Sequence, residues 1–277
     1  MTGGKSRRRL VVNADDFGFT RDVNRGIVEA HLNGILTSTT LMANGREFDD
    51  AVRLARDHPS LDIGVHLVLV QGESVLGPGG ALPATLGQLL RAVALRRLQV
   101  YDELRAQVVR ICDAGLRPSH LDTHKHTHLL PPVLDAVCRL SREFAIPWVR
   151  RPIDLPYQGT RGAIPWSKQA LGRALGGLSG HFHNKLRQYG CRTTDHFAGF
   201  SITGYLGEQQ AIDVLRALPP GSTEFMCHPG FCTAELRAMP TRLKDSREAE
   251  LRALTSPAVR ELLQSESIEL VNYRQLD

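Results

Sequence analysis

The sequence has few of the features that mark secreted or membrane-spanning proteins. Its five cysteines are scattered, odd in number and without a Cys-x-x-Cys pair, which excludes a disulfide framework and predicts reduced thiols. No apolar run reaches the roughly 18 residues that a transmembrane helix needs. The glycine- and arginine-rich start is followed by a short aliphatic run at 10–12, too short for a secretory signal. We therefore expect a cytoplasmic protein, and peripheral contact with the inner membrane stays open.

An excess of charge of one sign is also missing. The 34 basic and 29 acidic side chains leave a net charge of +5, whereas a nucleic-acid-binding protein usually concentrates a larger basic excess on one face. We therefore expect no nucleic-acid partner. The 277 residues, 42% of them hydrophobic, are enough for one domain of (β/α)-barrel size. The oligomeric state is open, with a homodimer as one option.

Short runs rich in β-branched residues alternate with segments of helical period, which is typical of βα units. The expected strands are 10–13, 38–42, 62–69, 119–123, 147–150, 224–227 and 268–271. The expected helices are 23–33, 48–57, 101–114, 133–144, 208–218 and 246–264. This order predicts an α/β fold, a single-domain barrel of parallel strands over residues 1–277 that need not be complete. Segments 71–86 and 152–190 interrupt the rhythm and are interpreted as insertions.

Asp15 and Asp16 stand side by side where the first expected strand ends, and in βα folds this end of a strand carries the active site. Capping of the next helix is the alternative role for one of them. Thr20 lies closer to the helix start at Arg21 and suits that role better. In metal-assisted hydrolysis one carboxylate commonly binds a cation while another acts as a base.

Histidines gather near the ends of further strands. His66 interrupts the apolar run 62–69, and by itself it is better explained as a core residue. Five residues recur at every second position of a later strand: His120, Asp122, His124, His126 and His128. Extended geometry would place all five on one side. Such a cluster is typical of a divalent-metal site in which one or two members bind the ion and the others orient them, and an exposed polar strand edge is the alternative.

His228 follows the strand 224–227 and precedes a Pro-Gly turn. It is a candidate general acid, although a histidine before proline is also ordinary in a turn. Asp195 and His196 lie in no clear strand pattern and stay unassigned. Cys227, beside His228, is interpreted as a packing residue because no oxyanion-hole motif accompanies it.

Five motifs in order over nearly the whole chain resemble the YdjC-like carbohydrate deacetylases. They are Asn-Ala-Asp-Asp-Phe-Gly at 13–18, Ser-Thr-Thr at 38–40, Gly-Val-His-Leu at 64–67, His-Leu-Asp-x-His-x-His-x-His at 120–128 and Met-Cys-His-Pro at 226–229. The resemblance implies a distorted (β/α) barrel that removes N-acetyl groups from amino sugars with one divalent metal, magnesium or zinc.

By motif position, the resemblance implies site residues in three roles. The metal ligands would be Asp16, His66 and His124, the base Asp15 and the acid His228. From the clustering in the tract itself, and not from the resemblance, we expect Asp122, His126 and His128 to orient ligands or contact substrate. The spacing alone permits His126 in place of His124.

The segment His-Pro-Gly-Phe-Cys at 228–232 resembles the branch of this family associated with hopanoid synthesis, which implies an N-acetylglucosaminyl hopanoid as substrate. Another branch acts on soluble chitooligosaccharides such as diacetylchitobiose, and this alternative stays open. Two further alternatives are an iron oxygenase, which uses the same two-His-one-carboxylate ligand set, and a sugar-binding protein without catalysis.

The second insertion suggests contact with a lipid. Segment 151–190 holds six basic residues against one acidic residue. Its larger apolar side chains recur at helical spacings: Trp166, Leu171, Leu175, Leu178 and Phe182. This pattern predicts a basic amphipathic helix on an anionic membrane, and a helix that buries its apolar face in the core explains it equally well.

Overall fold

The computed structural model describes residues 7–156, 165, 176–177 and 179–276. Within them, parallel strands form one curled sheet in the order β5-β4-β3-β2-β1-β7-β6, and β8 pairs with β1. The strands are β1 (Arg8–Phe17), β2 (Ser38–Leu41), β3 (Asp62–Leu67), β4 (His120–Thr123), β5 (Trp148–Val149), β6 (His196–Ala198), β7 (Gly221–Cys227) and β8 (Ile268–Leu270).

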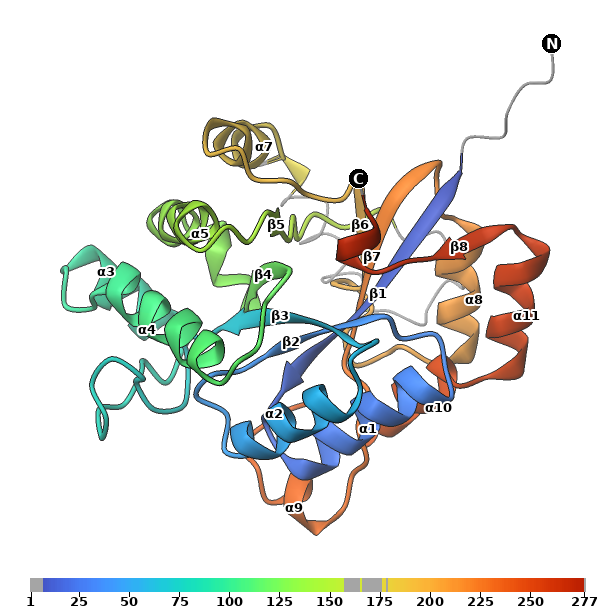
Figure 1. Cartoon of the computed structure of the whole chain (residues 1–277), viewed down its shortest axis with the longest axis horizontal. Helices are drawn as coiled ribbons and strands as arrows, with labels where there is room; N and C mark the ends of the chain where they lie inside the picture. Colours follow the sequence, from blue (N-terminus) through green and yellow to red (C-terminus); the bar gives the residue numbers. More distant parts are fainter. Residues whose placement is uncertain (1–6, 157–164, 166–175, 178, 277) are drawn as a thin grey trace.

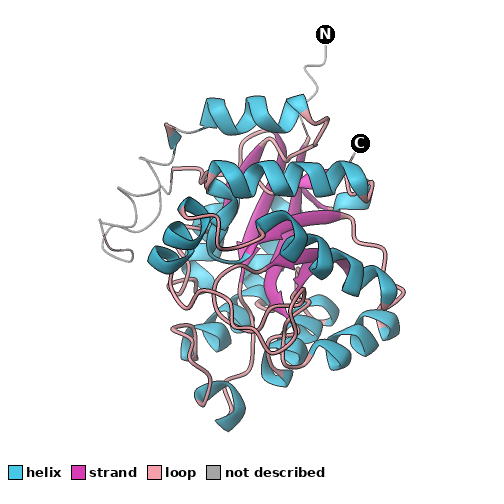
Figure 2. Ribbon diagram, turned by 90° about the vertical axis from the view of Figure 1, so that its left-hand side faces the viewer, coloured by secondary structure: helices cyan, strands magenta, loops and turns pink. Residues whose placement is uncertain are grey.

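Helices surround this sheet (Figures 1 and 2). They are α1 (Arg21–Leu32), α2 (Phe48–Asp57), α3 (Leu86–Ala94), α4 (Val100–Asp113), α5 (Pro131–Glu143), α7 (Ser179–Gln188), α8 (Glu208–Arg216), α9 (Ala234–Arg237), α10 (Asp245–Leu254) and α11 (Pro257–Ser265), with 3-10 turns at His124–Leu129 and Tyr273–Gln275. None of the described helices is long and apolar enough to cross a membrane. The prediction of a distorted single-domain (β/α) barrel is confirmed.

The two ends of the sheet approach each other through isolated bridges. Trp148 at β5 pairs with Arg192, and Asp154 pairs with Phe197 of β6. The N–H of Leu155 donates to the carbonyl of Phe197 over 2.7 Å. The sheet therefore curls until its two edges are joined, within the described residues, by isolated bridges and not by a continuous strand pair.

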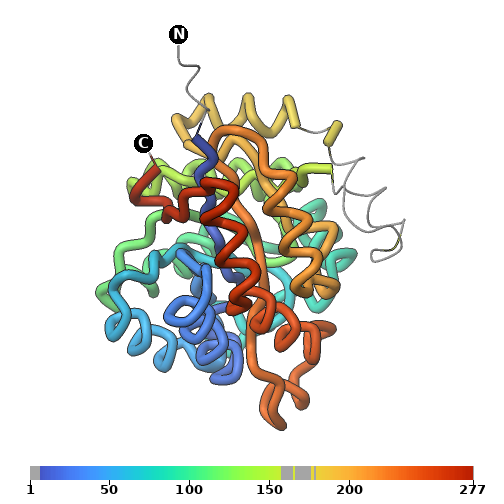
Figure 3. The backbone as a smooth tube through the Cα atoms, turned by 90° about the vertical axis from the view of Figure 1, so that its right-hand side faces the viewer, coloured from blue at the N-terminus to red at the C-terminus, as the bar shows by residue number. Residues whose placement is uncertain are grey.

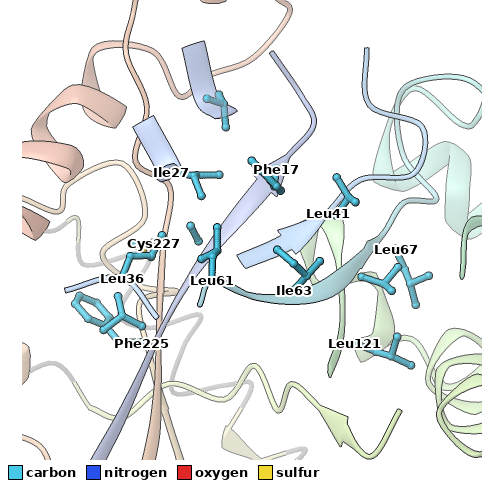
Figure 4. Packing of buried hydrophobic residues seen from close by; sticks show 14 of the residues in the cluster. Phe17, Ile27, Leu36, Leu41, Leu61, Ile63, Leu67, Leu121, Phe225 and Cys227 are labelled. Carbon is cyan, nitrogen blue, oxygen red and sulfur yellow. The ribbon is translucent and has the colours of Figure 1, made fainter. Parts of the chain in front are cut away.

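Side chains from strands and helices form a continuous core between the sheet and the helices that surround it (Figure 4). In α2 the buried residues are Phe48, Ala51, Val52 and Ala55. This spacing places all four on one face of the helix. As predicted, Thr20 caps α1, since its hydroxyl accepts from the N–H of Val23 at 3.2 Å.

The structure divides the helix predicted at 246–264 into α10 and α11, which both lie beside α8 (Figure 3). Pro257 begins α11, and proline lacks the N–H that a continuous helix would need there. The predictions missed α3, α9 and β6, whereas α7 falls at the end of the second insertion, where helical spacings had indicated a helix. Of the apolar residues singled out in the second insertion, Phe182 is buried on α7, whereas Trp166, Leu171, Leu175 and Leu178 lie outside the described residues.

Two glycines hold α1 against the loop that follows β7. A Cβ atom built on Gly26 would lie 2.3 Å from the Cα of Gly230, far inside van der Waals contact. The N–H of Gly230 in turn donates to the carbonyl of Arg247 at 3.2 Å. This close approach positions the loop that carries His228.

Candidate active site

The polar residues singled out in the sequence meet at the carboxyl edge of the sheet. Asp15 and Asp16 lie near the end of β1, His66 near the end of β3, His124 directly after β4 and His228 directly after β7. All five line one cavity of about 1100 Å³. Parallel strands bring their carboxyl ends to the same rim, so residues far apart in the sequence share one site.

A bulge in β1 accounts for the way two adjacent aspartates reach one cavity. The register between β1 and β2 shifts between Ala14 and Phe17, and Asp16 takes a left-handed φ of 70°. In a regular strand neighbouring side chains point to opposite faces. The bulge interrupts that alternation, so Asp15 and Asp16 both line the cavity.

Asp16, His66 and His124 converge on one point. Asp16 Oδ1 lies 3.4 Å from His66 Nε2 and 3.3 Å from His124 Nδ1, and the two nitrogens are 3.2 Å apart. Two ligands that each sit about 2.1 Å from an ion are about 3.0–3.4 Å apart at octahedral or tetrahedral angles. The three side chains therefore have the spacing and the donor types of a divalent-metal site.

Asp122 lies behind this group and orients His66. The Nδ1 of His66 lies 2.7 Å from Asp122 Oδ1, which leaves Nε2 directed at Asp16. A carboxylate on the far nitrogen is the usual partner of a metal-binding imidazole. Burial disfavours a charged ring, yet Asp122, together with Asp16 and Asp15, raises the pKa of His66 to about 10. The surroundings thus favour positive charge at this point, and a bound cation would satisfy the same preference.

Arg150 is a buried cation shared by three carboxylates, and the sequence analysis missed this role. Its Nη1 and Nη2 donate to Asp15 Oδ2 and Oδ1 at 2.8 and 2.7 Å. Nη1 also lies 2.6 Å from Asp122 Oδ2, and Nε donates to Glu224 at 2.6 Å. Two features of the sequence could have indicated this role: Arg150 ends the predicted strand 147–150, and Glu224 begins the predicted strand 224–227.

Asp15 and His228 face each other across the cavity floor, with His228 Nε2 3.8 Å from Asp15 Oδ2. Burial alone would raise the pKa of Asp15, but Arg150 and His66 hold it well below its usual range. Burial lowers the pKa of His228 to about 4 although Asp15 opposes the change. The free protein therefore presents a carboxylate beside a neutral imidazole.

The prediction that residues 119–128 form one extended segment with five side chains on one side is wrong. β4 ends at Thr123, and Lys125 and His126 both have positive φ in the turn that follows. The chain must leave the sheet here because Pro131 begins α5 in the outer layer. Thr123 stabilises the turn by accepting from the N–H of His128 at 3.1 Å.

As a result, the histidines of this tract have different surroundings. His120 stacks on Tyr273 with ring centroids 3.9 Å apart. His128 Nε2 lies 3.0 Å from the carbonyl oxygen of Arg150, so its ring is part of the interior. His126 lines the cavity and packs against Phe200, and its buried Nδ1 has no hydrogen-bond partner within the described residues. Of the tract, His124 is the member beside Asp16 and His66.

Arg247 of α10 is a second residue that the sequence analysis missed. It is buried, and its Nη2 donates to Asp16 Oδ2, while Asp16 Oδ1 faces the two imidazoles. Burial alone would raise the pKa of Asp16, but Arg247, with His124 and His66, holds it well below the usual range. One oxygen of Asp16 therefore stays directed at the candidate metal position. Nothing in the pattern of α10 distinguishes Arg247 from a surface arginine.

The remaining lining of the cavity combines apolar and cationic side chains. Its apolar lining includes Phe19, Met42, Val70, Val75, Met239 and Leu243. Its cationic lining away from the aspartates includes Arg46, Arg110, Lys125 and Arg242. Glu73 is the one acid among the described lining residues beyond Asp15 and Asp16.

This arrangement is that of a βα barrel with a candidate carboxylate–imidazole metal site at the carboxyl ends of its strands, and sequence comparison identifies the family. Residues 9–265 match the family described as YdjC-like protein. A carbohydrate deacetylase of Brevibacillus brevis is 32% identical over 273 residues, covering 97% of this chain and 99% of the relative. One of Geobacillus stearothermophilus is 32% identical over 275 residues, covering 97% and 98%. The chain belongs to the YdjC-like family.

Solved structures share this fold. A putative cellobiose-phosphate cleavage protein of Enterococcus faecalis superposes with a TM-score of 0.76 at 26% identity, covering 97% of this chain and 98% of that one. A lactam utilization protein of Thermus thermophilus superposes with a TM-score of 0.51 at 16% identity, covering 95% and 98%. The second likeness concerns the fold alone.

Proposed function

We propose that this protein is a metal-dependent carbohydrate N-deacetylase, which hydrolyses the acetamide of an N-acetylglucosamine-containing glycan or glycolipid. One observation carries the proposal: Asp16, His66 and His124 converge within 3.4 Å of one another beside Asp15, in the same cavity. The names of the two 32%-identical relatives support the same chemistry.

The cofactor we propose is one divalent ion, magnesium or zinc, held by Asp16, His66 and His124. Such an ion polarises the acetamide carbonyl and lowers the pKa of a water molecule. Three protein ligands leave coordination positions open for water and substrate. Asp122 and Arg247 would keep His66 and Asp16 in their orientations through the hydrogen bonds described above.

The proton path that we propose uses Asp15 and His228. Asp15, kept ionised and oriented by Arg150, accepts a proton from the attacking water. The 3.8 Å separation between Asp15 Oδ2 and His228 Nε2 is short enough for a small movement to pass this proton to the neutral imidazole. His228 then protonates the sugar nitrogen as the C–N bond breaks, and acetate and a free amine leave.

For the substrate, we favour an N-acetylglucosaminyl lipid such as an N-acetylglucosaminyl hopanoid. The cavity volume of about 1100 Å³ slightly exceeds the range of about 300–1,000 Å³ for ligand pockets. Its apolar lining at Phe19, Met42 and Val70 would suit an apolar aglycone next to the sugar.

Soluble sugars are the alternative substrate class, either diacetylchitobiose or a phosphorylated relative of it. The cationic lining at Arg46, Arg110, Lys125 and Arg242 would suit an anionic group, and the Enterococcus faecalis neighbour is described as a putative cellobiose-phosphate cleavage protein. The iron oxygenase remains a weaker alternative because it would leave Asp15 and His228 without a role. A sugar-binding protein without catalysis would bind metal and sugar but release no acetate.

The test is acetate release from a panel of substrates by the metal-loaded protein. The panel contains free N-acetylglucosamine, diacetylchitobiose, diacetylchitobiose 6-phosphate and an N-acetylglucosaminyl lipid. Fastest release from the lipid is the expected result. Fast turnover of a soluble sugar would reject the lipid preference and keep the deacetylase, whereas sugar binding without acetate release would reject both.

A further inference from the structure

The exposed large apolar side chains of this protein are concentrated near one helix. Among the described residues there are seven, and four of them fall within 76–95: Leu76, Leu86, Leu90 and Leu95. Leu86 and Leu90 are each 46% exposed and Leu95 is 50% exposed. Single exposed leucines are common on protein surfaces, but a concentration of them marks an interaction surface.

The geometry of α3 explains this exposure. Leu89 is the one buried residue of the helix, and Val93 is partly buried against the core. Leu86 and Leu90 are four residues apart and share one side of the helix. The helix lies at the outer margin of the molecule (Figure 1). Leu86, Leu89, Leu90 and Val93 therefore share one broad apolar face: the core covers its Leu89 and Val93 edge, and nothing in the described residues covers its Leu86 and Leu90 edge.

The charge around this exposed edge has one sign. Arg91, Arg96 and Arg97 are all exposed, and no aspartate or glutamate occurs between Glu73 and Asp102. Arginine beside exposed leucine on a short helix is the composition of segments that lie in the interface of an anionic bilayer. An acid-free stretch of this kind is complementary to anionic lipid headgroups.

A second copy of the chain fits this surface less well. A two-fold interface would bring the same patch of both copies together, so the arginines of one copy would face those of the other without an intervening carboxylate. A nucleic acid would be attracted by the arginines but would leave the leucines without a partner.

The surface is also connected to the active-site cavity. The segment that leads into α3 forms a short antiparallel pairing, with Glu73 opposite Ala81. Gln71 and Val75, which lie on either side of Glu73 in the sequence, line the cavity. A partner bound by α3 would therefore lie near the part of the cavity wall that contains Gln71 and Val75.

From these observations we propose that α3 and the residues that follow it, 86–97, are a docking surface for an anionic lipid bilayer, with Leu86 and Leu90 entering the interface and the three arginines binding headgroups. This inference deepens the lipid form of the proposed function, but it makes a separate prediction about binding. These residues are not those of the second insertion, 152–190, for which the sequence first suggested a membrane contact.

The experiment measures sedimentation of the full-length protein with vesicles of phosphatidylcholine, with and without phosphatidylglycerol, at low and high salt. We expect binding to the anionic vesicles that weakens with salt. Arg91→Gln/Arg96→Gln/Arg97→Gln should lower partition by about 100-fold, since each arginine near the surface contributes about fivefold. Leu86→Ser/Leu90→Ser should also lower partition, whereas Leu32→Ser, at a leucine that is 56% exposed on α1, is the matched control and should not.

Acetate release from a soluble sugar is measured on the same variants, so that failure of the deacetylase and failure of the docking surface are distinguishable. The docking variants should keep the wild-type rate. The proposal is overturned if wild-type protein ignores anionic vesicles or if both α3 variants bind them like the control. It is equally overturned if Leu86→Ser/Leu90→Ser converts a dimer to a monomer in analytical ultracentrifugation, because a second copy would then cover this surface.

Discussion

Arg150 and Asp15 form a two-pronged ion pair inside the protein, with N–O distances of 2.8 and 2.7 Å. Neither residue is more than 3% exposed. The same guanidinium contacts Asp122 and Glu224, so one cation offsets the charge of several buried carboxylates. The floor of the candidate site depends on this residue electrostatically.

Arg150→Met should therefore lower the free energy of unfolding by about 3–5 kcal/mol, the cost of leaving buried charges without a partner. Urea unfolding at neutral pH measures this. Arg150 depresses the pKa of Asp15, so its contribution is present at neutral pH and is lost as the pH falls through the pKa of the folded state. The deficit of the variant should shrink in acid.

Arg53→Met is the control for Arg150, because Arg53 is 60% exposed and pairs with Asp50 and Asp57 on α2. Exposed pairs contribute about 0.2–1 kcal/mol. If the two substitutions had equal effects on unfolding at neutral pH, the account of the buried network would be wrong.

His124→Ala should weaken metal binding more than either His126→Ala or His128→Ala. His124 Nδ1 lies 3.3 Å from Asp16 Oδ1, whereas His128 contacts Thr123 and a backbone carbonyl. Partners that only orient a ligand cost about 10–100-fold in affinity, and loss of a ligand should exceed that. Calorimetric titration of zinc into each metal-free variant decides it, and equal losses would leave the choice of His124 without support.

Asp15→Asn should keep metal and lose turnover, whereas Asp16→Asn should lose metal. Asparagine tolerates the left-handed backbone of residue 16, so this substitution changes charge without adding strain. Elemental analysis of the purified variants and acetate release are the two measurements. Metal and activity retained by both variants would refute the assignment of the pair.

Gly26→Ala should destabilise the protein by about 1–3 kcal/mol, because the new methyl group would overlap the backbone of Gly230. Gly180→Ala in α7 is the matched control, since a Cβ atom there meets nothing within 4 Å. In a helix alanine is favoured over glycine by about 1 kcal/mol. Thermal unfolding should separate the two variants, and a neutral Gly26→Ala would contradict the proposed contact.

Much of the fold and part of the site could be predicted from the sequence because both follow local patterns. Buried parallel strands are short apolar runs, and their carboxyl ends collect at one rim, so the sequence alone is enough to predict that Asp15, Asp16, His66 and His228 lie together. Short elements escaped because few residues carry their pattern. β6 has three residues, and α3 buries one side chain.

Other parts of the site depend on contacts that no local pattern encodes. Alternation in the tract 119–128 predicts an extended chain, but the positive φ of Lys125 and His126 turns it away from the sheet. Arg150 and Arg247 contact Asp15 and Asp16 across 135 and 231 positions of sequence. Such pairs are set by the three-dimensional arrangement, and each arginine alone looks like a solvent-exposed residue.

The most direct test of the central claim is acetate release from the substrate panel by one protein preparation in three states: as metal-loaded protein, after chelation, and after return of one equivalent of metal. The account predicts release by the loaded protein, none after chelation, and recovery when the metal returns. Undiminished release by the chelated protein, or no release from any member of the panel by the loaded protein, would contradict it.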